Sequence, residues 1–114
     1  MQIDDARIAI IGLGYVGLPL AVEFGKLFDV KGYDLNLQRI EELNNNIDNT
    51  FEMESNEISS SSKLSFTSIK NDLVDCNTFI ITVPTPINEN NEPDLIPLKN
   101  ATETISDVLK KGDI

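Results

Sequence analysis

The chain lacks histidine and tryptophan, and its 114 residues contain a single cysteine, Cys76. Histidine is the usual zinc ligand and the most common general base, so its absence argues against metal chemistry in this chain. One cysteine cannot form an internal disulfide. We therefore expect neither a metal site nor a disulfide framework.

Basic residues are scarce, because nine Lys and Arg stand against 19 Asp and Glu, which gives a net charge of −10. Without a cluster of positive side chains, the chain lacks the surface that nucleic-acid binding requires. No apolar stretch approaches the roughly 20 residues that span a bilayer, and residues 1–5 lack the basic-then-apolar order of a signal peptide. We expect no nucleic-acid partner, no membrane insertion and a cytoplasmic location.

The chain does contain apolar runs that alternate with amphipathic segments. A chain of this length can bury one modest core, which predicts a single domain over residues 1–114. Alternating strands and helices are typical of a parallel sheet with right-handed crossovers. The sequence therefore predicts an α/β fold, a Rossmann-like doubly wound parallel sheet in three layers (α/β/α), truncated after about four strands. The expected strands are residues 7–11, 29–34, 64–67 and 77–83.

The spacing of apolar residues also predicts which face of each helix packs on the sheet. The first helix is expected to start close to Gly14, and Asn36 is expected to cap the second. Residues 44–62 are rich in Asn, Ser and Glu and predict a loop with one helical turn around 53–58. The faces expected to be buried are Val16, Leu20, Phe24 and Leu27, then Leu37, Ile40 and Leu43, and finally Leu98, Ile105, Val108 and Leu109.

Three glycines follow the first strand in a G-x-G-x-x-G pattern, which alone is weak evidence for a nucleotide site. The preceding strand, the following helix and a later acidic residue, Asp34, strengthen it. Gly12 would permit a tight turn, Gly14 would let main-chain amides approach a diphosphate, and Gly17 would let the helix sit close to the sheet. The alternative is that these glycines belong to an ordinary strand-to-helix turn.

Asp34 ends the second expected strand, where a carboxylate can bind both hydroxyls of an adenosine ribose. This arrangement favours NAD over NADP, because a 2′-phosphate would be repelled. Alternatively, Asp34 caps the second helix. Arg39 has two interpretations, a group that tolerates a 2′-phosphate or a solvated arginine on the helix surface.

Thr85 lies between two prolines directly after the last expected strand. Prolines fix the backbone and withhold amide donors, so Pro84 and Pro86 predict a stiff loop that presents the Thr85 hydroxyl to a ligand. In the alternative interpretation, the prolines only end the sheet.

Taken together, the segments 12–19 and 83–86, and Asp34 with Arg39, resemble the UDP-glucose/GDP-mannose dehydrogenase family. The chain is most similar to bacterial UDP-N-acetylhexosamine 6-dehydrogenases of surface-polysaccharide synthesis, partly through residues 48–52. In that family, the resemblance implies, NAD accepts hydride in two successive steps that oxidise the C6 alcohol of a UDP-sugar to a carboxylate. It also implies that Tyr15 belongs to the cofactor turn and that Val16, Asp34, Arg39 and Thr85 contact NAD.

The catalytic cysteine of that family, with its lysine and asparagine partners, is expected beyond Ile114. The chain is therefore predicted to be an amino-terminal fragment that binds NAD without catalysing the reaction. Cys76 lies before the last expected strand, away from the nucleotide site, with no neighbour expected to lower its pKa, and is predicted to be an inert thiol. The last strand is expected to be an uncovered edge, so that the isolated fragment self-associates or is only marginally stable, and the enzyme is expected to be a homo-oligomer.

Two other functions stay open at this point. The chain can be a complete, non-enzymatic module that binds NAD or an adenine nucleotide, or part of an NADP-linked reductase of another Rossmann family. Cofactor titration with NAD and NADP separates the second alternative from the main prediction.

Overall fold

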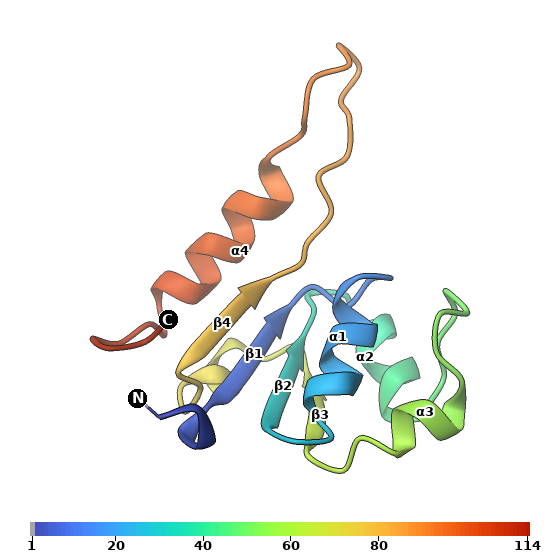
Figure 1. Ribbon diagram of the computed structural model, residues 1–114. Coiled ribbons are helices and arrows are strands. Elements are labelled where there is room, and N and C mark those ends of the chain that lie inside the picture. The colour runs from blue at the N-terminus through green and yellow to red at the C-terminus, as the bar shows by residue number, and fades with distance from the viewer. Residues whose placement is uncertain (1) are drawn as a thin grey trace.

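A parallel sheet of four strands in the order β3-β2-β1-β4 lies at the centre of the computed structural model, which describes residues 2–114 (Figure 1). Met1, which belongs to the amino-terminal segment considered for targeting, lies outside the described residues. None of the helices in this part of the chain has the length and apolar character needed to cross a bilayer. The strands are β1 (Arg7–Ile11), β2 (Asp29–Tyr33), β3 (Leu64–Thr67) and β4 (Thr78–Ile81). The α-helices are α1 (Gly17–Phe24), α2 (Leu37–Asn44), α3 (Ser55–Ser59) and α4 (Ile96–Ser106). Short 3-10 helices span Ile3–Asp5 and Lys70–Leu73.

The central strand β1 sends alternate side chains into two hydrophobic cores. Ile8 and Ile10 pack with residues of α1, α2 and α3 on one face of the sheet. Ala9 and Ile11 pack with residues of α4 on the other face. All four side chains are at most 4% exposed, as expected for a parallel strand covered on both sides. The predicted three-layer α/β fold is confirmed.

The helix α1 begins at Gly17, later than predicted, and faces the sheet with different residues. Val16 and Leu27 are 61% and 71% exposed, whereas Leu18 and Val22 are fully buried. The predicted face is wrong at both ends because these two residues lie in the turns that flank the helix, where helical spacing no longer sets side-chain direction. The other two predicted contacts, Leu20 and Phe24, are partly buried against the core.

The helix α2 is capped as predicted, since the side chain of Asn36 accepts a hydrogen bond from the N–H of Arg39 at 3.2 Å. Leu37, in the first turn, is 71% exposed, so its predicted burial is wrong, while Ile40 and Leu43 are buried. The helix α3 lies in the segment predicted as a loop with one helical turn, and Ile58 anchors it in the core.

The helix α4 ends at Ser106, before the predicted limit at Leu109. Ile105 and Val108 are buried as predicted, whereas Leu98 and Leu109 are 37% and 50% exposed. The loop that joins β4 to α4 projects away from the sheet (Figure 1). The predicted buried face of this helix is therefore confirmed only in its second half.

The strand β4 forms an edge of the sheet, as predicted, and ends at Ile81 rather than Val83. The N–H of Phe79 donates to the carbonyl of Ile114 at 2.7 Å, and the N–H of Ile114 donates to the carbonyl of Asn77 at 2.9 Å. The prediction of a wholly uncovered edge is thus wrong for the first half of this strand, because Ile114 pairs with it.

Candidate cofactor site

A cavity of about 480 Å³ opens at the carboxyl ends of β1, β2 and β4, against one face of α4. This is the edge at which doubly wound sheets bind their ligands, and the volume is in the range of small-molecule sites. Four of the eight predicted site residues line it, namely Gly12, Gly14, Asp34 and Arg39. The other lining residues are Ile11, Leu13, Tyr33, Leu35, Asn36, Val83, Pro84, Ile96, Pro97, Asn100, Ala101 and Thr104.

Two of the glycines in the turn after β1 are required by its geometry. Gly12 has a φ of +105°, a conformation that L side chains rarely adopt, and a Cβ there would lie 3.0 Å from the main chain of Thr82. A Cβ on Gly17 would overlap the carbonyl oxygen of Gly12. The predicted structural roles of these two glycines, a tight turn and close helix packing, agree with this geometry.

Gly14 differs from both, because a Cβ built on it meets no atom of the described residues within 4 Å, its two chain neighbours aside. The N–H groups of residues 14–17 donate no hydrogen bond to any other part of residues 2–114. These groups lie at the amino-terminal end of α1, where the helix dipole adds positive potential. The turn therefore offers free donors, positive potential and open space, the three features that a diphosphate needs.

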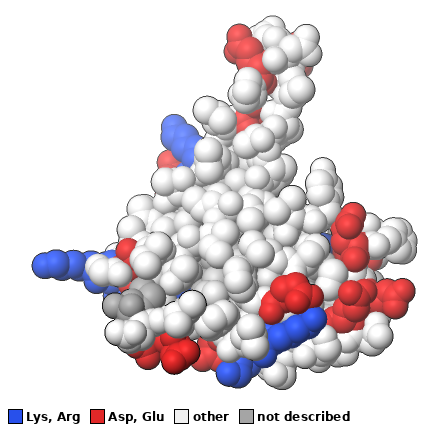
Figure 2. Space-filling view, in the orientation of Figure 1, with Lys and Arg blue, Asp and Glu red and all other residues white. Residues whose placement is uncertain are grey.

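This attraction is local, because the chain as a whole is acidic. Acidic side chains gather along the lower rim of the molecule and at the tip of the projecting loop (Figure 2). The net charge of −10 would repel an anion at long range. Main-chain donors in the turn after β1 thus carry the interaction with any bound diphosphate.

Asp34 follows β2 and contacts the glycine-rich turn directly. Its Oδ2 accepts a hydrogen bond from the N–H of Leu13 at 3.0 Å, and its Oδ1 accepts one from the N–H of Asn36 at 2.9 Å. The alternative in which Asp34 caps α2 is wrong, because Asn36 is the cap. A carboxylate has about four lone-pair positions, so acceptor capacity remains for two ribose hydroxyls.

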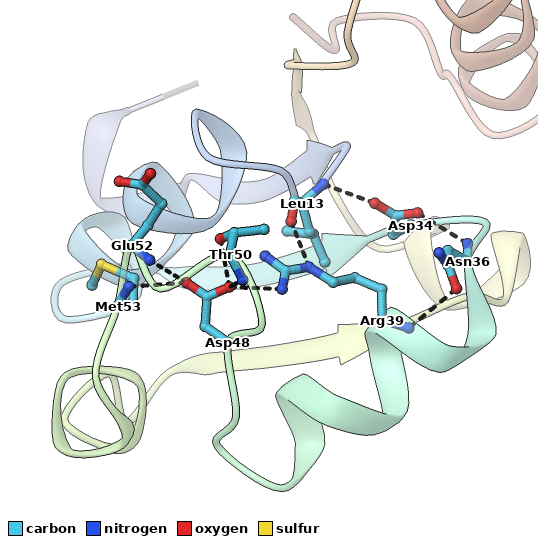
Figure 3. A network of polar contacts seen from close by, with 8 residues as sticks. All are labelled: Leu13, Asp34, Asn36, Arg39, Asp48, Thr50, Glu52 and Met53. Atoms are coloured by element: carbon cyan, nitrogen blue, oxygen red, sulfur yellow. Dashed lines mark hydrogen bonds and ion pairs between the residues drawn. The ribbon is translucent and has the colours of Figure 1, made fainter.

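Arg39 is not a solvated surface arginine, since the residue is only 9% exposed. Its Nε donates to the carbonyl of Leu13 at 2.8 Å, and its Nη1 pairs with Oδ1 of Asp48 at 2.7 Å. Figure 3 shows the side chain running from α2 away from Asp34 and toward Asp48. Nη2 is buried and has no partner within the described part of the chain. The surface interpretation is therefore wrong.

The remaining predicted site residues lie outside the cavity. Tyr15, Val16 and Thr85 are exposed, and Gly17 is buried behind the turn. Pro84, which precedes Thr85, does line the cavity. Cofactor contact by these residues stays a prediction.

Two groups of residues at the site were missed by sequence reasoning. One is the face of α4 formed by Asn100, Ala101 and Thr104, which follow helical spacing but carry no chemical motif. The other is Asp48, whose segment the sequence analysis used only as a point of resemblance. An acidic residue in a polar segment gives no sign that it is buried.

Cys76 lies away from the cavity, two residues before β4, and is 3% exposed. Burial raises the pKa of its thiol and outweighs the opposing effect of Lys31 and Arg7, so it is not activated. The absence of any neighbour that lowers the pKa, assumed from the sequence, is not correct. The conclusion that this thiol is no activated nucleophile agrees with the structure.

A parallel sheet with a glycine-rich turn after its first strand and a carboxylate after its second defines a dinucleotide-binding domain of the Rossmann type. The sequence model of one protein family, described as the UDP-glucose/GDP-mannose dehydrogenase family, NAD binding domain, matches residues 6–114. The chain belongs to this family and is its NAD-binding domain, which confirms the resemblance drawn from its motifs.

Known relatives agree with this assignment in sequence and in structure. UDP-N-acetyl-D-glucosamine 6-dehydrogenase of Pseudomonas aeruginosa is 57% identical over 110 residues, which are 96% of this chain and 26% of that protein. The structure of UDP-D-ManNAc dehydrogenase from Pyrococcus horikoshii matches with a TM-score of 0.82 and 37% identity over 95% of this chain and 27% of that one. A ternary complex of GDP-mannose dehydrogenase from Pseudomonas aeruginosa matches with a TM-score of 0.81 and 28% identity over 87% and 24% of the two chains. The chain thus spans about a quarter of the length of the curated relatives it matches.

Proposed function

We propose that this chain is the cofactor-binding part of an NAD-dependent dehydrogenase that oxidises the C6 alcohol of a UDP-N-acetylhexosamine to a carboxylate. The overall change consumes two NAD and one water and yields the carboxylate, two NADH and three protons, with each NAD taking one hydride. The catalytic cysteine and its partners are expected outside these 114 residues. The part of this chain is to bind and orient the cofactor. The names of the relatives, at up to 57% identity, support the substrate class.

The observation that carries the proposal is that the turn with the free amides and the carboxylate of Asp34 lie next to each other beside one cavity. The free N–H groups of residues 14–17 would bind the diphosphate, and Asp34, which directly follows β2, is hydrogen-bonded to the N–H of the adjacent Leu13. That carboxylate would accept hydrogen bonds from both hydroxyls of the adenosine ribose. A 2′-phosphate in the same place would meet a negative charge, which favours NAD over NADP.

The predicted contacts of Tyr15, Val16, Arg39 and Thr85 belong to the same proposal. Tyr15 and Val16 project from the turn that carries the free amides, and Thr85 follows the lining residue Pro84. Arg39 reaches the site through its bond to the carbonyl of Leu13. Each residue is thus within or next to a segment that borders the cavity.

Isothermal titration calorimetry of the full-length protein with NAD and NADP tests the proposal. We expect NAD to bind more tightly than NADP, and Gly14→Val to abolish binding because its side chain fills the open space above the amides. The exposed substitution Asp107→Ala serves as a control and leaves binding unchanged. NAD binding that survives Gly14→Val would place the cofactor elsewhere.

We further propose a homo-oligomer and a cytoplasmic location. Among residues 2–114, nothing pairs with the outer edge of the second half of β4, from Ile80 onward, as Ile114 pairs with the first half, and open edges recruit partner strands. The free cysteine is compatible with a reducing compartment. Sedimentation velocity measures the oligomeric state of this chain and of the full-length protein, and a monomer in both would overturn the first proposal.

A further inference from the structure

Leu13, which precedes Gly14 in the turn after β1, is hydrogen-bonded through both its N–H and its carbonyl. The N–H of Leu13 donates to Asp34 at 3.0 Å, and its carbonyl accepts a bond from Nε of Arg39 at 2.8 Å. The peptide is trans, so the carbonyl of Leu13 and the N–H of Gly14 point in opposite directions. The bond from Arg39 therefore determines where the free N–H of Gly14 points.

Arg39 is itself held in place by Asp48. The guanidinium Nη1 lies 2.7 Å from Oδ1 of Asp48, and the two side chains are 10% and 0% exposed. A buried ion pair with a short bond constrains both partners more than an exposed one does. The position of the guanidinium thus depends on the position of this carboxylate.

Asp48 is fixed in turn by the loop that follows it. Its Oδ1 accepts bonds from the N–H and the hydroxyl of Thr50 at 2.9 and 2.6 Å, and its Oδ2 accepts bonds from the N–H groups of Glu52 and Met53, both at 2.9 Å. Figure 3 shows this network on the side of Arg39 opposite Asp34. The carboxylate is therefore a rigid anchor built by the segment 48–53.

The anchor also neutralises the charge of Arg39. An arginine near the adenosine ribose is the usual partner of a 2′-phosphate. Here the guanidinium turns away from Asp34 and is paired with another carboxylate (Figure 3). The positive charge is therefore not offered on the side where Asp34 would hold the ribose.

We propose that Asp48 is a positioning residue of the cofactor site, which acts through Arg39 to aim the N–H of Gly14 at the diphosphate of NAD and to withhold the guanidinium from a 2′-phosphate. This inference rests on the proposed function, since it takes NAD to bind in this cavity. It adds a determinant of cofactor choice that contacts neither the ribose nor the phosphates.

Calorimetric titration of the full-length protein with NAD and NADP tests the inference. Asp48→Asn is expected to weaken NAD binding about tenfold, and NADP binding less, so that the ratio of the two affinities falls. In an Arg39→Gln background, the same substitution is expected to change NAD affinity less than about twofold, because its effect passes through Arg39. Equal losses for both dinucleotides, or an undiminished effect in that background, would overturn the inference.

Leu73→Ala provides the control for stability. Leu73 is fully buried in the core on the α4 side of the sheet and does not line the cavity. Its truncation is expected to lower the melting temperature and leave the affinity ratio unchanged. A purely structural role for Asp48 would make Asp48→Asn behave in the same way, which contradicts the inference.

A milder variant covers the case in which Asp48→Asn does not fold. Thr50→Val removes the hydroxyl bond to Asp48 but keeps both charges, so a smaller fall in the affinity ratio is expected. An unchanged ratio in a folded Thr50→Val protein would count against the inference. If the wild-type protein binds no NAD, the proposed function fails as a whole, whereas normal NAD binding by Asp48→Asn overturns only the role of Asp48.

Discussion

Thr82 Oγ1 donates a hydrogen bond of 2.7 Å to the carbonyl of Gly12, which ties the residue after β4 to the turn after β1. The N–H of Thr82 also donates to the carbonyl of Ile11 at 2.8 Å. A Cβ on Gly17 would lie 2.5 Å from the same hydroxyl, so α1 closes against this contact as well. The shape of the glycine-rich turn therefore depends on a side chain that follows the neighbouring strand β4, 70 residues later in the sequence.

Replacing Thr82 with Val should lower the free energy of unfolding by about 1 kcal/mol, because the hydrogen bond to the carbonyl of Gly12 is lost while the shape of the side chain is kept. Urea unfolding followed by circular dichroism measures the change. Thr82→Ser keeps the hydroxyl and is expected to retain most of the stability. A loss in Thr82→Ser with none in Thr82→Val would show that the methyl group, not the bond, matters.

Gly14→Ala and Gly17→Ala should have opposite effects. A Cβ at position 17 overlaps the main chain of Gly12, so we expect this variant to lose about 1–3 kcal/mol of stability. A Cβ at position 14 points into open space, so thermal unfolding should change little while NAD binding weakens. Differential scanning fluorimetry combined with calorimetry separates the two outcomes, and a destabilised Gly14→Ala would contradict the assignment.

Asp34→Ala should weaken NAD binding more than NADP binding. For NAD, the substitution removes the acceptor of the ribose hydroxyls, and binding weakens. For NADP, it also removes the repulsion of the 2′-phosphate, which offsets part of the loss. Titration with both dinucleotides measures the difference. Asp72→Ala, in a carboxylate outside the cavity, is the matched control, and a loss of equal size for both cofactors at position 34 would refute the role.

Stability should fall in acid partly because of Asp48. Burial alone would raise its pKa, but hydrogen bonds from Thr50, Arg39 and Met53 outweigh this and hold the pKa well below its ordinary value of 3.8. A carboxyl whose pKa is lowered by folding stabilises the protein above the unfolded value and loses this contribution as the pH falls further. Melting temperatures between about pH 5 and about pH 2 should therefore drop more steeply in the wild type than in Asp48→Asn. Parallel curves would contradict this account.

Cys76 should react slowly with iodoacetamide at neutral pH, because its thiol is buried and its pKa is raised. Mass spectrometry of the intact protein follows the reaction, and unfolding in urea should make the thiol fully reactive. Cys76→Ala is expected to keep NAD binding. Rapid modification in the native state would show that the strand opens locally or that the thiol is activated.

The order of elements and the turn after β1 were predictable because each depends on local sequence. The apolar run of β1 alternates between two cores, Gly12 requires a positive φ, and Asn36 caps α2 in the expected place. These features depend on the residue type and its immediate neighbours. Topology then follows from the rules that govern parallel sheets.

The environment of charged side chains was not predictable in the same way. Arg39 and Asp48 form a buried ion pair, although both residue types are usually exposed. Their meeting depends on how the loop after α2 folds back, and no local pattern encodes that path. Val16 and Leu27 were misplaced for a related reason, since the exact ends of α1 decide whether they face the sheet or the solvent.

The position of β1 between β2 and β4 sets an order for folding during synthesis. On one side β1 pairs with β2, which follows it closely in the chain. On the other side, the contact between Gly12 and Thr82 joins residues that are 70 positions apart. Contacts between distant residues are slower to form, so the layer built on α1 and α2 can assemble while the rest of the chain is still emerging from the ribosome. The cavity needs walls from both layers, and it is therefore among the last features of the molecule to be completed.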